Sequence, residues 1–203
     1  MKLFRFLFCI AVLCSGTCLQ AMELDGPTEQ LRPALDALIV VLDDESLKGQ
    51  ENKVKRRGLI MAEISSGFDF HEMSRRVLGR TWNEITPEQQ NYFVTQMTKL
   101  LENVYVGKLE TYTGQAVEFV AERIKGNRAQ VTTLIEDEGV KLPVHYIMRK
   151  TGNKWMVYDI NIEGVSLIRN YKEQFRSILR QQKYEGLIKT IENKNLSFEK
   201  ESG

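Results

Sequence analysis

The sequence predicts an α+β domain in which helices pack on one face of a four-stranded antiparallel sheet. Apolar residues recur at helical spacing in the first half of the chain and again after Gly164, and the stretch between them alternates with period two. Three short turn sequences divide this alternating stretch into four strands. Helices grouped before and after one antiparallel sheet are typical of α+β proteins.

The chain begins with a segment typical of a secretory signal peptide. Lys2 and Arg5 precede an apolar run, residues 7–14, which is shorter than the roughly 20 apolar residues that span a bilayer. Small and neutral residues lead from this run to Ala21, and the sequence becomes polar soon afterwards. We therefore expect residues 1–21 to be a signal peptide that is removed.

All three cysteines, Cys9, Cys14 and Cys18, lie within this leader. The mature chain therefore has no thiol, and its roughly 180 residues can bury a sufficient core without a disulfide. This cysteine usage favours the bacterial periplasm over eukaryotic secretion. The alternative is a lipoprotein with lipid on Cys14 or Cys18, but neither cysteine follows the small residue of a good lipobox.

The charge of the mature chain gives no strong attraction to nucleic acid. The full chain has 28 basic and 27 acidic residues, and the loss of Lys2 and Arg5 changes its net charge from +1 to −1. The sequence also has no basic stripe with interleaved aromatic residues. Because no second apolar run is long enough to span a membrane, we predict a soluble mature protein.

Three helices are predicted before the middle of the chain. Leucines at helical spacing predict the first helix over residues 31–42. A charged stretch that begins at Lys53 leads into the apolar positions of a second helix, up to Ile64. Residues 68–78 form the third predicted helix, which Gly79 ends.

The fourth helix has the clearest start signal in the sequence. Thr86 can accept hydrogen bonds from free N–H groups, Pro87 suits the first helical position, and Gln89 completes a capping box. The apolar residues that follow lie on one face of a long helix and are Phe93, Met97, Leu100, Leu101, Val104 and Tyr105.

Four β-branched and aromatic segments then follow, over residues 115–124, 128–137, 140–150 and 154–162. The segments between them are typical of hairpin turns and are Lys125-Gly126-Asn127, Glu138-Gly139 and Thr151-Gly152-Asn153. We therefore expect an antiparallel meander. Pro143 has no N–H to donate to a neighbouring strand, so it marks an edge or a bulge.

Helical spacing returns after Gly164, and Ser166 is the expected N-cap of the helix that follows. We expect Gly186 to separate a last short helix from it, and residues 193–203 to form a flexible polar tail. The sequence contains no internal repeat and no linker. Residues 22–192 are therefore predicted to form a single domain.

The sequence lacks the motifs of common metal and nucleophile sites. His71-Glu72-Met73-Ser74-Arg75 begins like a zinc-protease motif, but Arg75 occupies the place of the second histidine. With only two histidines in the chain, we predict no metal site and no cofactor. Gly164-Val165-Ser166 resembles half of a nucleophile elbow, but Ile168 occupies the position of the second glycine.

Asp69, Asp159 and Glu163 are the acids to consider in an enzyme, and Asp159 or Asp69 could serve as its base. Asp159 lies on a predicted strand between Tyr158 and Ile160, where a buried, hydrogen-bonded structural carboxylate is the simpler interpretation. Asp69 is explained as simply by a capping or supporting role at the third helix. We therefore predict no catalytic residue.

Two blocks of the sequence are specific enough to compare with known families. The first block is Phe68-Asp69-Phe70, Met73-Ser74, Val77-Leu78-Gly79, Trp82 and Thr86-Pro87-Glu88-Gln89. The second block is Lys154-Trp155-Met156-Val157-Tyr158-Asp159-Ile160, Glu163-Gly164-Val165-Ser166-Leu167, Asn170-Tyr171 and Gln174-Phe175. Both blocks resemble the MlaC family of periplasmic phospholipid-binding proteins, also called the toluene-tolerance or ABC-transporter auxiliary family. One departure is Lys172, where family members commonly carry arginine, so the charge is kept without the bidentate fork.

The resemblance implies a phospholipid carrier that is not an enzyme. Its fold would be similar to the nuclear-transport-factor-like (NTF2-like) group, with a curved sheet and with lipid tails between sheet and helices. Members of the family carry phospholipid between the outer membrane and an inner-membrane ABC transporter, and so maintain the lipid asymmetry of the outer membrane. The implied partners are the transporter complex with its membrane-anchored substrate-binding domain and an outer-membrane lipoprotein–porin complex.

The resemblance also directs attention to apolar residues that could contact the cargo. The candidate lipid-binding residues come from the predicted sheet and the helices that could cover it, and are Leu101, Val104, Tyr105, Val131, Val144, Tyr146, Met148, Val157 and Ile168. Val144, Tyr146 and Met148 share one face of a strand because side chains alternate. A slip of one residue in the register would reverse that face.

Two other functions remain open at the level of the sequence. One is an enzyme on the same scaffold with Asp159 or Asp69 as base in an apolar cleft. The other is an adaptor that binds only proteins, which would have a filled core and an exposed apolar patch. Apolar patterning does not separate a filled core from a cavity, so the structure has to decide between these alternatives.

Overall fold

A computed structural model describes residues 26–137 and 139–202 of the chain, so the predicted signal peptide lies outside the described residues. The α-helices are Pro27–Asp43 (α1), Lys53–Gly67 (α2), Phe70–Leu78 (α3), Pro87–Leu109 (α4) and Leu167–Ser202 (α5). The strands are Ala116–Lys125 (β1), Arg128–Asp137 (β2), Val140–Thr151 (β3), Lys154–Ile162 (β4) and Val165–Ser166 (β5). Short 3₁₀ turns follow α1 and α3.

The strands form one antiparallel sheet in the order β1-β2-β3-β4-β5. The four long strands confirm the predicted segments to within one residue at each end. The expected strand number was one too low, because Val165–Ser166 also pairs with the end of β4. This pairing covers only two residues, so it leaves no period-two pattern in the sequence. Pro143 stands at a local edge, as predicted, because β3 pairs with β4 only from Val144 onward.

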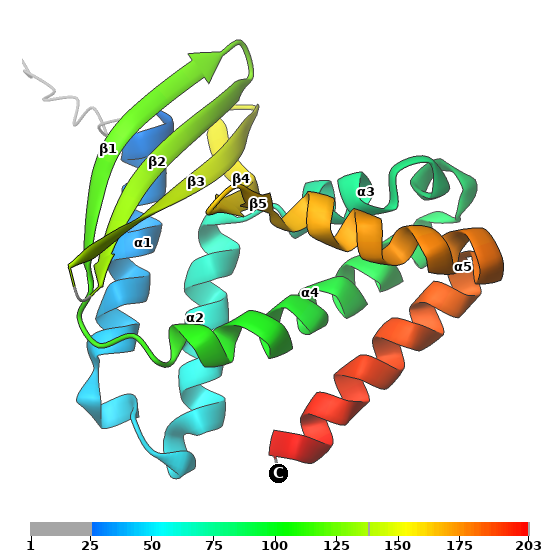
Figure 1. The fold of residues 1–203 in the computed structure, drawn as a ribbon, viewed down its shortest axis with the longest axis horizontal. Helices are drawn as coiled ribbons and strands as arrows, with labels where there is room; N and C mark the ends of the chain where they lie inside the picture. The colour runs from blue at the N-terminus through cyan, green and yellow to red at the C-terminus, as the bar shows by residue number, and fades with distance from the viewer. Residues whose placement is uncertain (1–25, 138, 203) are drawn as a thin grey trace, which may run out of the picture.

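The sheet and the helices form separate layers (Figure 1). The strands make a curved layer, α1 runs along it, and α2 lies beside α1. Helix α4 runs from the end of the molecule where α3 and α5 lie back toward the sheet. The predicted α+β class with a curved sheet is therefore confirmed.

The start of α4 is built by the predicted capping box. The Gln89 N–H donates to Thr86 Oγ1 at 3.3 Å, and the Thr86 N–H donates to Gln89 Oε1 at 2.9 Å. The start of α3 differs from the prediction by two residues. Phe68 forms a parallel bridge with Val157 of β4, and this extended backbone delays the helix until Asp69 has capped it.

Helix α5 corrects two expectations about the C-terminal region. The helix bends at Lys183, which has φ 60° and ψ −163°, rather than at Gly186. The expected polar tail, residues 193–203, is also wrong as far as Ser202, because helix α5 continues to that residue. Asn195 explains this continuation, since its side chain is buried and donates to the backbone and side-chain oxygens of Gln96 on α4.

The buried side chains of the core come from both layers. Phe93 and Met97 of α4, Met148 of β3, and Leu187 of α5 are almost fully buried within one cluster. Burial of apolar surface is the main stabilising contribution to such a fold. Among the described residues, no helix is long and apolar enough to cross a membrane.

Candidate functional site

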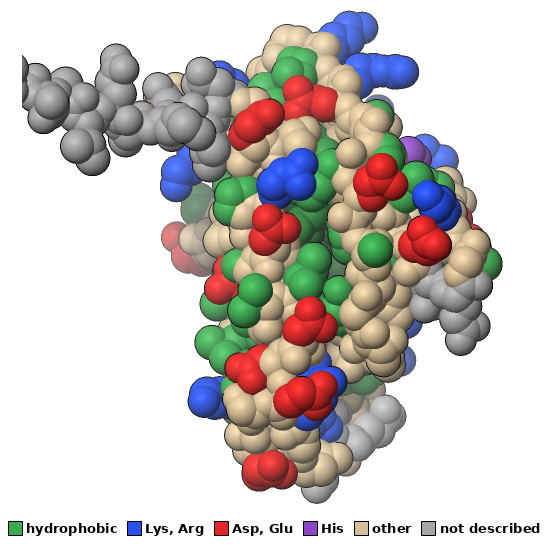
Figure 2. Space-filling view, turned by 90° about the vertical axis from the view of Figure 1, so that its left-hand side faces the viewer, with side chains coloured by type: hydrophobic (Ala, Val, Ile, Leu, Met, Phe, Trp, Pro, Cys, Tyr) green, Lys and Arg blue, Asp and Glu red, His purple; other side chains and the backbone are tan. Residues whose placement is uncertain are grey.

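A cavity of about 380 Å³ lies between the inner face of the sheet and helices α1, α2 and α4. This volume is within the range of about 300–1,000 Å³ that is typical of small-molecule pockets. Figure 2 shows hydrophobic side chains gathered in a hollow strip on one face of the molecule, with acidic side chains along it. The apolar wall residues include Leu31, Leu35, Leu38, Met61, Ile64, Phe68, Phe70, Leu101, Val106, Leu109, Ile135, Val144, Val157, Ile160, Ile162 and Leu167.

The sheet contributes its wall through side-chain alternation and one irregularity. Val144 and Tyr146 face the cavity from β3 because they are two residues apart. Val157 and Ile160 of β4 are three residues apart, yet both line the cavity. The register between β3 and β4 shifts between Ile147 and Met148, and such a bulge returns both side chains to one face.

The helical wall comes from α1, α2 and α4. Leu31, Ala34, Leu35 and Leu38 recur at the spacing that places side chains on one helix face, and all of them line the cavity. The side chains opposite them come from α2 and α4. Because three helices and a sheet enclose the space, a ligand in it would be surrounded mainly by carbon atoms.

The N-terminal end of α1 forms hydrogen bonds with β1 and β4, the outer two of the four long strands. On β1, Glu122 Oε2 accepts from the Thr28 N–H at 2.8 Å and from the Thr28 hydroxyl at 2.6 Å. At the other edge, the Trp155 N–H donates to Gln30 Oε1 at 2.7 Å. These contacts hold α1 at a fixed distance from the strands, so the space between them is not closed by collapse of the helix.

The predicted lipid-binding residues divide into two groups in the structure. Those that line the cavity are Leu101, Tyr105, Val144, Tyr146 and Val157. The others lie elsewhere: Val131 and Met148 are fully buried in the core, Ile168 packs against that core, and Val104 lines a second hollow on α4. The expected face of β3 is confirmed by the burial of all three of its predicted residues.

Sequence reasoning missed the walls that α1 and α2 provide. Leu31, Leu35 and Leu38 were recognised as a helical stripe but not as candidate binding residues, and Met61 and Ile64 of α2 were also omitted. The only indication in the sequence was that the apolar stripe of α1 continues along the whole helix. That stripe shows which face is buried but not which element it faces.

Few charged groups reach the cavity. Glu63, Glu102 and Lys108 contribute to its lining, and Arg57 Nε lies 3.6 Å from Glu102 Oε1. Lys108 is the only cation among the described residues of the lining, and its Nζ lies 5.6 Å from the centroid of the Tyr105 ring. Burial raises the pKa of Tyr146, so the phenol that faces the cavity stays uncharged.

The two acids considered as catalytic bases both have structural partners. Asp159 is buried, and it accepts hydrogen bonds from the Ser166 hydroxyl at 2.6 Å and from the Ile168 N–H at 3.1 Å. Ser166 Oγ in turn accepts from the Arg169 N–H, which confirms Ser166 as the N-cap of α5. Asp69 Oδ1 accepts from the Glu72 N–H at 2.8 Å and caps α3. Neither carboxylate lines the cavity.

The incomplete zinc-protease motif also has a structural explanation. His71 packs edge-on against the Trp82 ring, with ring centroids 5.0 Å apart. Glu72 is buried and pairs with Arg75, Arg76 and Arg149 at 2.8, 2.8 and 3.1 Å. In the part of the chain that the structure describes, no group of three or more histidine, cysteine or acidic side chains could hold a metal ion.

The fold and the cavity together define a class of α+β protein with an apolar compartment between a curved sheet and its covering helices. The family model for MlaC protein matches residues 32–193. This match spans most of the chain, and the chain therefore belongs to the MlaC family.

Individual relatives agree with this assignment. The chain is 23% identical over 169 residues to the intermembrane phospholipid transport system binding protein MlaC of Haemophilus influenzae, and the match covers 80% of this chain and 79% of that protein. It is 28% identical over 109 residues to toluene tolerance protein ttg2D of Pseudomonas putida, covering 53% of this chain and 50% of that protein.

A solved structure shares the fold. The phospholipid-binding protein from Ralstonia solanacearum, solved in complex with a phospholipid, is 26% identical and superimposes with a TM-score of 0.77. The likeness covers 85% of this chain and 98% of that one. The predicted family and fold class are thus both confirmed.

Proposed function

We propose that this protein binds a phospholipid with its acyl chains buried in the apolar cavity and carries it through water between membranes. The cavity between α1, α2, α4 and the sheet carries this proposal, because its lining is almost entirely apolar. Each methylene group removed from water contributes about 0.8 kcal/mol, so an acyl chain gains most from such a lining. The relatives named for phospholipid transport and phospholipid binding support the same cargo.

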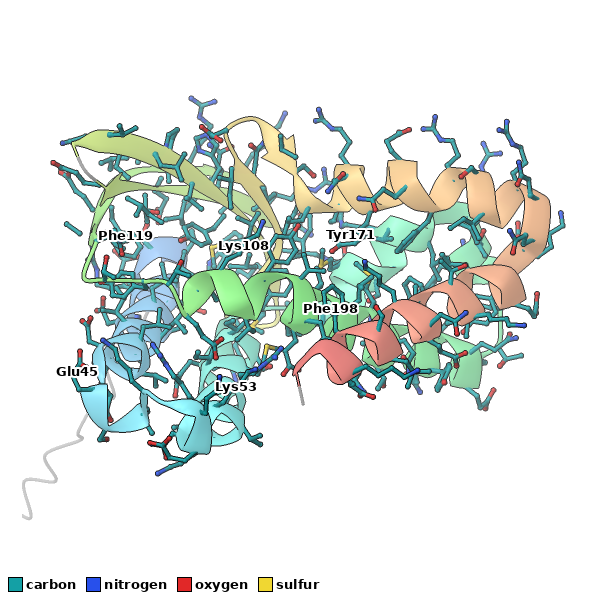
Figure 3. The ribbon with its side chains drawn as sticks, turned by 60° about the horizontal axis from the view of Figure 1, so that its bottom comes forward. Glu45, Lys53, Lys108, Phe119, Tyr171 and Phe198 are labelled. Carbon is teal, nitrogen blue, oxygen red and sulfur yellow. The ribbon has the colours of Figure 1, made fainter. Side chains whose placement is uncertain are left out.

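Lys108 is a suitable partner for the headgroup phosphate. Its side chain is exposed, it belongs to the cavity lining, and a lysine ammonium pairs with phosphate as a point charge. Figure 3 shows Lys108 between α4 and the sheet. A single exposed cation gives little headgroup selectivity, which fits a carrier that has to release its cargo.

The proposal also covers the cellular location of the carrier and its membrane partners. We place it in the periplasm, where it would move phospholipid between an outer-membrane lipoprotein–porin complex and an inner-membrane ABC transporter and so maintain outer-membrane lipid asymmetry. The leader-like residues 1–21 and the name of the Haemophilus relative support this location and role. The proposal needs no enzymatic step, since Asp69 caps α3 and Asp159 accepts hydrogen bonds from Ser166 and Ile168 at the start of α5.

Filling the cavity should weaken phospholipid uptake. Val144 is buried and lines the cavity, so Val144→Trp places an indole where the acyl chain would lie. We expect delipidated Val144→Trp protein to take up fluorescent phospholipid from vesicles with at least about tenfold lower affinity, because the excluded methylenes each contribute about 0.8 kcal/mol.

The matched control is Val54→Trp, since Val54 lies on α2 and is 86% exposed. This variant should take up phospholipid like the unmodified protein. Circular dichroism and thermal unfolding of both variants would show that the fold is retained. Equal uptake by Val144→Trp and Val54→Trp would contradict the assignment of the cavity.

A further inference from the structure

The charges of the mature chain are nearly balanced in number but unevenly placed. Without Lys2 and Arg5 the chain carries 26 basic and 27 acidic side chains. Two segments that lie far apart in the sequence, residues 70–84 and 167–183, together carry eight basic and three acidic side chains. Helix α1 has the opposite balance, because it carries three acids and one base. Positive and negative charge are therefore concentrated in different parts of the molecule.

The first half of α5 presents its basic residues on one face. Its exposed basic side chains recur every three or four residues and are Arg169, Lys172, Arg176 and Arg180. This spacing aligns them along one side of the helix, and we call them the α5 ridge. The one acid of residues 167–183, Glu173, pairs with Arg176 at 2.6 Å. Both side chains are more than half exposed, so water screens this pair and the ridge remains strongly positive.

The positive charge continues from α5 onto α3. The two helices lie side by side (Figure 1). A Cβ on Gly79, the C-cap of α3, would lie 3.9 Å from Lys172 Nζ, so the ridge reaches the end of α3. On α3, the buried carboxylate of Glu72 is outnumbered by the three arginines that pair with it. We call the ridge and these three arginines together the α3–α5 basic face.

The composition of this face indicates what kind of partner fits it. Among the described residues of the two segments, no large hydrophobic side chain is exposed. A protein–protein interface normally has an apolar centre inside a polar rim, which is missing here. None of the ridge residues lines the cavity or the second hollow on α4, so the ridge does not surround a single small anion. A bilayer with anionic lipids instead presents many phosphates in one plane, and each lysine or arginine near it adds to the attraction.

We propose that the α3–α5 basic face adsorbs to the surface of bilayers rich in anionic phospholipid. The contact is electrostatic and inserts no side chain into the hydrocarbon core. The acidic helix α1 lies away from α3 and α5 (Figure 1), so repulsion from the same surface favours one orientation of the carrier. The cavity takes no part in this contact, and the inference is therefore independent of the proposed function.

Neutralising the α5 ridge tests the assigned face. The variant Arg169→Gln/Arg176→Gln/Arg180→Gln removes three charges and keeps residues that favour a helix. Its binding is measured by co-sedimentation with sucrose-loaded vesicles of equimolar dioleoyl phosphatidylcholine and dioleoyl phosphatidylglycerol at low ionic strength. The unmodified protein should bind these vesicles and lose the binding in high salt, because salt screens the attraction. Since each charge near the surface changes the affinity about fivefold, the variant should bind at least about tenfold more weakly.

Two controls separate the position of the charges from other effects. Lys55→Gln/Arg123→Gln/Lys125→Gln removes the same charge from exposed positions on α2 and on β1, at the sheet edge opposite β5. This variant should bind within about twofold of the unmodified protein, because charges farther from the bilayer than the screening length contribute little. Val144→Trp, with its filled cavity, should also sediment with the vesicles normally. Vesicles of phosphatidylcholine alone should bind none of these proteins.

Three results would overturn the proposal. If the unmodified protein does not sediment with the anionic vesicles, the basic face does not serve a membrane, and an acidic protein becomes the partner to seek. Equal weakening in both triple variants would show that net charge acts without any particular face. Loss of sedimentation in Val144→Trp would show that the vesicle contact is cargo uptake through the cavity.

Hydrogen exchange gives a second measurement that needs no variant. The unmodified protein is exchanged with and without the anionic vesicles and analysed by peptide mass spectrometry. We expect the vesicles to slow exchange in α3 and in the first half of α5, and to leave α1 unchanged. Protection of α1 in place of α3 and α5 would contradict the assigned orientation and overturn the proposal.

Discussion

Glu72 illustrates how much of a residue's role depends on partners that are distant in sequence. The sequence places Arg75 and Arg76 one turn away, but Arg149 arrives from β3. The roles of Asp69 and Ser166 were predictable because a cap contacts backbone within three residues of itself. The Glu72 cluster was not predictable, because it needs α3 to lie within reach of the Arg149 side chain on β3.

The Glu72 cluster predicts a loss of stability in acid. Burial alone would raise the pKa of Glu72, but hydrogen bonds from Arg75 and Arg76 outweigh it and lower the pKa from 4.5 to about 2. Because the pKa of Glu72 is lower in the folded protein than in the unfolded chain, its ionised carboxylate stabilises the fold at pH values above about 4.5. This stabilisation is lost as the pH falls from about 4.5 toward 2. The full pKa shift of Glu72 corresponds to about 3 kcal/mol of unfolding free energy. Solvent screens the partly exposed arginines, so we expect a contribution of roughly 1–3 kcal/mol.

Urea unfolding between pH 7 and pH 2.5 measures this effect. The free energy of unfolding should fall more steeply with acid in the unmodified protein than in Glu72→Gln, which has no proton to bind at this site. Glu72→Gln should also be less stable at pH 7, because three arginines lose their anionic partner. Parallel pH profiles for the two proteins would show that Glu72 does not have the lowered pKa.

At the scale of secondary structure, local signals determined most boundaries. The glycines at the hairpin turns and the capping box at Thr86 act within four residues, and the four long strands and the start of α4 were predicted closely. Helix α5 shows where local signals fail. Gly186 was correctly marked as unusual, but the helix bends at Lys183, and a Cβ on Gly186 would approach the Gln182 Cβ to 2.2 Å. Gly186 thus permits a close contact beside the bend.

The bend in α5 predicts a stabilising substitution. Lys183 has φ 60° and ψ −163°, a conformation that glycine adopts readily and other residues adopt at a free-energy cost of about 1–3 kcal/mol. Lys183→Gly should therefore raise the free energy of unfolding by about 1 kcal/mol, since the flexibility of glycine in the unfolded state offsets part of the gain. Lys189→Gly, at an exposed helical position of α5, should instead lower it by about 1 kcal/mol.

Thermal and urea unfolding of the two variants give the comparison directly. Opposite shifts from the same exchange of lysine for glycine would confirm the left-handed backbone at Lys183. A destabilisation of similar size in both variants would indicate that α5 continues through Lys183 without the bend. In that case the second half of α5 would not lie against α4.

At the scale of the whole molecule, the sequence predicted the layers but not the space between them. The stripe on α1 and the alternation on β3 have the same appearance whether the two surfaces touch or leave a gap. The gap depends on where Thr28 and Gln30 fasten α1 to the strands, through contacts with residues more than ninety positions away. Only the resemblance to a carrier family suggested a cavity, and the structure added the walls from α1 and α2.

The central claim is that the cavity holds a phospholipid, and the lipid content of the purified protein tests it most directly. The full chain, residues 1–203, is produced in a bacterial host, purified without detergent, and extracted with organic solvent for quantitative mass spectrometry. We expect about one diacyl phospholipid per protein chain in the unmodified protein and in Val54→Trp, and almost none in Val144→Trp. A protein that carries no more phospholipid than Val144→Trp does, even after incubation with vesicles, would contradict the claim.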